Sequence, residues 1–168
     1  MTISMYAASV PVFRQILNSM SEILAKAETH ATARKIEPAA LLQARLYPDM
    51  FALYRQVQIA ADFAKGACAR LAGVEVPKYD DTEQSFVDLR ARIAKTIAFV
   101  DSLPKENIDG SEERVINTSA GANSKTFAGQ AYLNHYALPQ FFFHATTAYA
   151  ILRHNGVEVG KRDFMGKF

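Results

Sequence analysis

HYALPQFFFHATTAYAILRHNG, residues 135–156, decides the fold of this chain, and it holds three of the four histidines and a run of three phenylalanines. The stretch predicts the second half of a long helix from about Gly129 to His154, followed by Gly156 as a helix-ending residue. This helix is apolar almost all round, which is typical of a helix that lies central in a core or is covered by another subunit. We expect no other segment of so small a domain to cover its outer side. The pattern therefore predicts a homodimer through this helix.

The histidines of this helix make a poor metal-binding pair. His135 and His144 are nine residues apart, which is about 900° of helical rotation, so they point to opposite sides. Pro139 lies between them and predicts a kink. Helical histidine ligands need a spacing of three or four residues, and the residue four positions before His144 is Gln140. The spacing thus favours a buried helix that contains histidine, and we expect His135 to lie at an interface.

Three further apolar periodicities predict long helices, at about residues 9–30, 48–73 and 82–104. In the second, Pro48 suits the first helical position. For the third, either Asp81 or Thr82 is the expected N-cap. Together with the last helix they predict an all-α four-helix bundle that forms a single domain over residues 1–168.

Two shorter features interrupt this pattern. EPAALLQARL predicts a short helix after Pro38. RVINTSAGANSKTFAG, residues 114–129, predicts two short strands around SAGANS, because Gly and Asn suit the turn of a hairpin. A small β-hairpin is therefore expected just before the last helix.

Composition excludes several classes of protein. Apolar residues make up 49% and charged residues 21%, as in soluble globular domains, and the net charge is +2 with scattered basic residues. We therefore expect no nucleic-acid partner and no membrane partner, since no apolar run reaches the roughly 18 residues of a membrane span. The single cysteine, Cys68, excludes an internal disulfide and is expected to be a small buried residue. With no secretory leader at the N-terminus, this predicts a cytoplasmic protein.

Three segments resemble one family. SVPVFRQIL, ARLYPDMFALYRQVQIAADFAKGA and FFFHATTAYAILRHNGV are similar to DUF1993, a branch of the DinB/YfiT superfamily, and the resemblance extends over essentially the whole chain. It implies a DinB-like four-helix bundle with a long crossover and a small β-hairpin insert before the last helix. It also implies a metal site in the superfamily's metal-binding members, built from HxxxH in the last helix and one histidine in the second.

The resemblance carries these ligand positions onto Gln58, Gln140 and His144. Two of the three histidines are thus replaced by glutamine, whose neutral carbonyl oxygen is a weak donor for zinc or nickel. The resemblance therefore implies a degenerate metal site, with His144 as the one ligand candidate. We expect no cofactor, and a divalent metal stays an alternative.

Three interpretations of this constellation remain open. It is a hydrogen-bonded polar layer, in which His144 faces the interior within reach of Gln58 and Gln140. Alternatively, it is a polar cleft that binds a small organic molecule, with Asp62 and Lys65 at its mouth. The third is a metal-dependent enzyme similar to the thiol-dependent transferases and isomerases of the superfamily, with His144 as ligand or general base. Glutamine at both partner positions favours a non-catalytic or ligand-binding protein.

Overall fold

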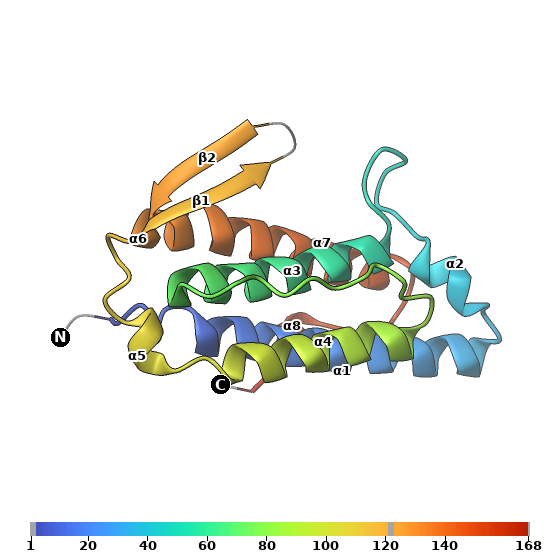
Figure 1. The fold of residues 1–168 in the computed structure, drawn as a ribbon. Helices are drawn as coiled ribbons and strands as arrows, with labels where there is room; N and C mark the ends of the chain where they lie inside the picture. The colour runs from blue at the N-terminus through green and yellow to red at the C-terminus, as the bar shows by residue number, and fades with distance from the viewer. Residues whose placement is uncertain (1–2, 121–122, 168) are drawn as a thin grey trace.

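Four long helices carry the fold in the computed structural model, which describes residues 3–120 and 123–167 (Figure 1). They are α1 (Val10–Arg34), α3 (Leu53–Ala72), α4 (Phe86–Asp101) and α7 (Leu138–His154). α3 packs against α7 and α4, and α1 packs against α4. The predicted all-α bundle is confirmed.

The long crossover joins α3 to α4. These two helices run in the same direction, so the chain has to return along their length between them (Figure 1). It does so as an extended segment without helix or strand, residues 74–85, which we call the strap. Asp81 and Thr82 lie in the strap, so their prediction as N-caps is wrong. The N-cap of α4 is Ser85, whose Oγ accepts from the backbone N–H of Asp88 at 3.1 Å.

The second long helix begins later than the sequence predicts. Pro48 lies in a turn, where the N–H of Met50 donates to the carbonyl of Tyr47 at 3.0 Å. Proline suits the second position of such a turn as well as the first turn of a helix, because both need its fixed φ. α3 therefore starts at Leu53, whose N–H donates to the carbonyl of Ala44 at 2.9 Å.

The predicted hairpin is confirmed. β1 (Val115–Ala120) pairs with β2 (Asn123–Ala128) in antiparallel register, and the expected turn at residues 121–122 lies outside the described residues. The hairpin rises from the bundle and lies above the first turns of the last helix (Figure 1). It leads directly into α6 (Gly129–Tyr132).

The last helix contains one wide turn instead of a simple kink. Between α6 and α7 the chain forms a π-helical turn, Leu133–Ala137, in which the N–H of Leu138 reaches back five residues to the carbonyl of Leu133. Pro139 explains the change, because it has no N–H and its ring clashes with the carbonyl four residues earlier in a regular α-helix. The wide turn relieves that clash while the helix continues.

The outer side of α7 is covered in part by the chain itself. The ring of Tyr149 packs against Phe164 of α8 (Lys161–Met165), with ring centroids 5.8 Å apart. α8 is held on α1 by an ion pair between Lys26 and Asp163, 2.6 Å from Nζ to Oδ1. The expectation that no other segment could cover this helix is therefore wrong.

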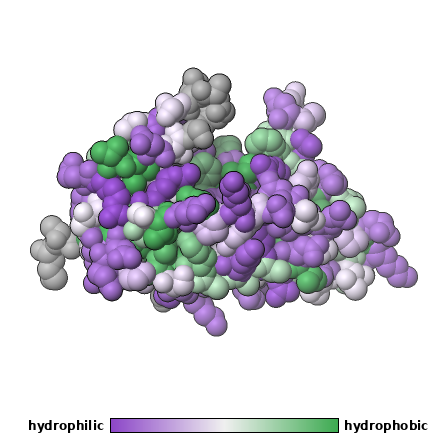
Figure 2. All heavy atoms as spheres, in the orientation of Figure 1, coloured by the Kyte–Doolittle hydropathy of each residue, from purple (hydrophilic) through white to green (hydrophobic). Residues whose placement is uncertain are grey.

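The core lies between the four long helices. Two short helices, α2 (Pro38–Leu42) and α5 (Lys105–Ile108), lie in the connections between them. Cys68 is fully buried, as predicted, and burial raises the pKa of its thiol, with a smaller contribution from the charge of Asp101. The face seen in Figure 2 is mostly hydrophilic, with hydrophobic residues showing between the hydrophilic ones. Within the described residues every helix is too short or too polar to cross a bilayer.

Candidate functional site

His144 lies inside the bundle and is hydrogen-bonded to α3. Its Nδ1 is 2.7 Å from Oε1 of Gln56. His144 is 8% exposed and Gln56 is 1% exposed, so bulk water hardly competes with this hydrogen bond. α7 supplies the histidine and the first turn of α3 supplies the glutamine.

The neighbours of Gln56 fix the protonation state of the ring. Its Nε2 donates to the carbonyl of Phe51 at 3.1 Å, which leaves Oε1, an acceptor, toward His144. Nδ1 of His144 must therefore carry the proton, and in the neutral ring Nε2 keeps its lone pair. Burial, and secondarily the charge of Arg55, lowers the pKa of His144, so the ring is neutral at pH 7. In the part of the chain that the structure describes, the imidazole is thus oriented and neutral, and its Nε2 accepts no hydrogen bond.

Aromatic rings surround this imidazole. Phe63 stacks on it with ring centroids 6.0 Å apart and planes 14° apart, and Phe143 meets it edge-on at 5.2 Å. The chain of rings continues from Phe63 to Tyr136 at 5.9 Å, and from Tyr136 to Phe127 of β2 at 5.3 Å. The hairpin is thereby joined to His144 through ring contacts.

A small cavity opens beside this aromatic chain. Its volume is about 250 Å³, and we call it the α7 cavity. Its lining comes from the π-helical turn and the start of α7: His135, Tyr136, Pro139, Gln140 and Phe143. His135, expected at an interface, is exposed there. Gln140 lies one helical turn before His144, so the cavity and the imidazole share one stretch of helix.

Gln58 does not belong to this site, which corrects the predicted contact with His144. Its side chain is fully buried, but its Nε2 donates to Oε2 of Glu83 at 2.7 Å and its Oε1 accepts from Arg55 at 3.1 Å. Residues two apart on a helix point about 200° from each other, so Gln56 and Gln58 face different neighbours. No hydrogen bond joins Gln140 to His144 within residues 3–120 and 123–167.

Gln58 instead borders a cluster of charges that holds the strap against the bundle. At its centre is Arg92 of α4, whose side chain is 1% exposed. One terminal nitrogen of its guanidinium lies 2.9 Å from Asp62 and 3.0 Å from Asp81, and the other lies 2.9 Å from Glu83. Lys65 joins through Asp62 at 2.9 Å. These five residues are the strap cluster, and it contains the Asp62 and Lys65 that the sequence placed at the mouth of the His144 site.

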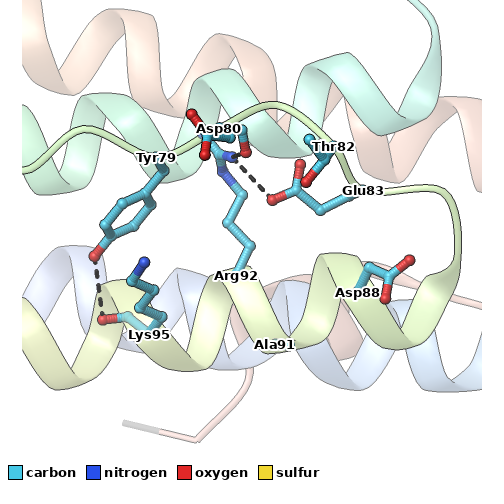
Figure 3. A pocket seen from close by; sticks show the side chains of 8 residues that line it. All are labelled: Tyr79, Asp80, Thr82, Glu83, Asp88, Ala91, Arg92 and Lys95. Atoms are coloured by element: carbon cyan, nitrogen blue, oxygen red, sulfur yellow. Dashed lines mark hydrogen bonds and ion pairs between the residues drawn. The ribbon is translucent and has the colours of Figure 1, made fainter.

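A larger cavity, of about 420 Å³, lies between the strap and α4 (Figure 3). In it, Arg92 reaches from α4 toward Glu83 on the strap. The ring of Tyr79 lies 3.8 Å from Nζ of Lys65 and 4.1 Å from Nζ of Lys95, and burial raises the pKa of its hydroxyl. Arg92 and Glu83 pair across this cavity at 2.9 Å, and this ion pair clamps the strap to α4. The spare acceptor of His144 makes the α7 side the better candidate site.

The residues around His144 do not fit a tightly held transition metal. Such a site needs three good protein ligands. Here Nδ1 of the one imidazole is engaged by Gln56, and Gln58 is committed to Glu83 and Arg55. In the described part of the chain no group of three or more His, Cys, Asp or Glu side chains could hold a metal ion.

Comparison with known proteins places the whole of this architecture in one group. A family described as "Domain of unknown function (DUF1993)" matches residues 5–165. A solved structure of a DinB family member protein from Shewanella denitrificans is similar, with 39% sequence identity and a TM-score of 0.88; the match covers 97% of this chain and 92% of that chain. No curated protein matches. The similarity includes α3, the hairpin and α7, which together build the site.

Proposed function

The chain belongs to the DUF1993 family, with a DinB-like fold, and on this premise we propose that it binds a small organic molecule beside His144. The observation that carries the proposal is the hydrogen bond from Nδ1 of His144 to Gln56. A buried imidazole that is held in one tautomer, with its other nitrogen unused, is typical of groups that accept a hydrogen bond or a proton from a ligand. The α7 cavity, whose lining residue Gln140 lies one helical turn before His144, supplies room for such a molecule. We place this function in the cytoplasm, in keeping with the free thiol of Cys68.

The roles of the residues follow from their contacts. Gln56 holds the ring and its tautomer, and Phe63 limits its rotation by stacking on it. Nε2 of His144 accepts a hydrogen bond from an O–H, N–H or S–H group of the ligand. Gln140 offers an amide that both donates and accepts at the wall of the cavity.

Catalysis is the second candidate function, and the spare lone pair on Nε2 is the observation that favours it. His144 would act as general base on a thiol: the S–H proton moves to Nε2, which leaves a thiolate and an imidazolium. Gln56 supports that step, because its oxygen accepts from Nδ1–H in both protonation states. The donor set does not fit a metal, so this candidate is a metal-free reaction.

We also propose a homodimer through α7. Although α8 covers part of this helix, Phe143 remains 56% exposed on it, and Tyr47 and Phe51 of the loop before α3 are 66% and 54% exposed. Large exposed aromatic side chains of this kind are enriched at interfaces between subunits. A second copy seated there would close the outer side of the α7 cavity. Light scattering tests this: we expect twice the chain mass of 18.6 kDa, and a mass equal to one chain at micromolar concentration would refute it.

The binding proposal is tested by NMR on protein labelled with ¹³C and ¹⁵N in histidine. The chain has four histidines, so each ring is followed separately. In a screen with a diverse set of small fragments we expect some fragments to shift the signals of His144 and of His135, which lines the α7 cavity, and the His135 shift to be lost in His144→Gln. His154→Gln, at the exposed end of the same helix, is the matched control and should bind as the parent does. If no fragment shifts His144 in the parent protein, the proposed function is wrong.

A further inference from the structure

The walls of the α7 cavity favour flat rings over other shapes. Two of its lining residues, Tyr136 and Phe143, are aromatic, and a third, Pro139, is apolar. Phe143 is 56% exposed, so its apolar surface gains by being covered. Aromatic pairs contribute about 0.5–1.5 kcal/mol beyond the burial of their area.

The volume of the cavity limits the size of the ring. Its 250 Å³ exceeds the roughly 150 Å³ of a buried apolar cavity that accepts benzene. It falls below the roughly 300 Å³ at which pockets for drug-sized molecules begin. A single ring with one or two small substituents fits between these limits.

The charges nearby favour an anion. The residues that line the α7 cavity, as far as the structure describes the chain, include no carboxylate. Lys125 of β2 lies close to one of the lining residues, with its Nζ 5.3 Å from the centre of the Tyr136 ring. The side chain is exposed and long, so its ammonium can turn from the ring to a bound carboxylate. Burial lowers the pKa of His144, so the neutral ring does not add to the positive charge of Lys125.

From these contacts we propose that the ligand is a small planar aromatic carboxylate. Its ring lies against Tyr136 and Phe143, its carboxylate pairs with Lys125, and a polar substituent reaches Gln140 or Nε2 of His144. This inference rests on the proposed function and names its ligand class. The hairpin thereby gains a role, since it carries Lys125, the cation that selects the ligand's charge.

Three probes separate the ring from the charge: benzoate, benzamide and cyclohexanecarboxylate, each titrated by NMR into the full chain at about 20 mM salt. We expect benzoate to bind about threefold to fivefold more tightly than benzamide, which lacks the charge, and more tightly than cyclohexanecarboxylate, which lacks the aromatic ring. Raising the salt to about 0.2 M should weaken benzoate and leave benzamide unchanged, since only the ion pair is screened.

Two variants locate the contacts. Lys125→Gln should weaken benzoate roughly threefold to fivefold, as expected for an exposed ion pair, without affecting benzamide. Phe143→Ala should weaken both aromatic probes. Lys95→Gln is the matched control, because Lys95 also lies over a tyrosine ring, that of Tyr79 at 4.1 Å, but on α4. It should change nothing.

The outcomes distinguish this inference from the proposal beneath it. Equal affinity for the three probes, or benzoate binding that both variants leave unchanged, would overturn the ligand class. If the fragment screen finds ligands at His144 but no aromatic acid among them, the ligand class falls and the proposed function stands. If nothing binds beside His144, both fall.

Discussion

Nδ1 of His144 and Oε1 of Gln56 lie 2.7 Å apart and join α7 to α3 inside the bundle. Both side chains are more than nine-tenths buried, so each would be left without a partner if the other were removed. The bond also sets which atom of the imidazole is free, because Gln56 is itself held by the carbonyl of Phe51. Structure and chemistry are therefore coupled at this one contact, and the first prediction concerns it.

The first prediction is that Gln56→Glu raises the pKa of His144 by about one pH unit or more. A carboxylate next to Nδ1–H favours the protonated ring, whereas the amide of Gln56 carries no charge. The pH titration of the imidazole ¹⁵N signals measures this. In the parent protein the same spectra should show a neutral ring with the proton on Nδ1.

Gln58→Glu is the control for this experiment, since Gln58 faces Glu83 on the strap side of α3. It adds the same charge two residues away and should leave the His144 titration nearly unchanged. A larger effect from Gln58→Glu than from Gln56→Glu would show that the assignment of the two glutamines is reversed.

The second prediction concerns the strap cluster. Arg92→Met should lower the free energy of unfolding by about 2–4 kcal/mol, because three carboxylates lose the cation that they share. We place the loss below the value for fully buried pairs, since the side chains of Asp62 and Asp81 are 38% and 40% exposed. Urea denaturation measures it, and hydrogen exchange should rise first in residues 74–85.

Arg90→Met gives the matched comparison on the same helix. Arg90 is 40% exposed in its side chain and lies 3.9 Å from Glu28, so we expect a loss under about 1 kcal/mol. If both variants lose the same stability, Arg92 is not the clamp that holds the strap.

The third prediction is a pH dependence of stability that His144 causes. Burial lowers the pKa of His144 in the folded protein, so the unfolded chain takes up a proton more readily than the folded one. This contribution to stability is complete above about pH 6.5, the usual pKa of histidine, and is lost as the pH falls below it. The free energy of unfolding should therefore decrease from pH 7.5 to pH 5.

Other groups act in a different pH range. The pKa of Asp88, Asp109 and Asp163 is lowered by hydrogen bonds, so their contributions are lost only below about pH 4. In His144→Gln the slope between pH 7.5 and pH 5 should become shallower, whereas His154→Gln should retain it. An unchanged slope in His144→Gln would assign the pH dependence to another group.

The fold follows from the sequence because its signals are long. Apolar periodicity over many residues predicts each of the four helices, and the turn residues around residues 121–122 predict the hairpin. Helix ends are less certain, because one residue type serves two local structures. Pro48 fits a turn as well as a helix start, and Asp81 forms an ion pair with Arg92 instead of capping α4.

The site was predicted only in part, for a reason of geometry. His144 on the inner side of the last helix follows from its pattern, but the choice between Gln56 and Gln58 depends on a rotation of about 200°. A signal for Gln56 was present: it lies seven residues, about two turns, before Phe63, which stacks on His144. The strap cluster could not be foreseen, since it depends on how α3, the strap and α4 pack to bring Asp62, Glu83 and Arg92 together.

The last prediction decides between the two glutamines by building a metal site. With Gln56→His and Gln140→His, three imidazoles should face one another around His144, because Gln56 already contacts its ring and Gln140 precedes it by one turn. Three histidines and an open position are a good zinc or cobalt site. We expect the double variant to retain about one metal ion per chain after dialysis and to show visible cobalt absorption. The alternative pair, Gln58→His with Gln140→His, should retain little, since Gln58 faces the strap. Tight metal binding by the alternative pair alone would mean that Gln58 turns toward His144 in solution, and the site described around Gln56 would then be wrong.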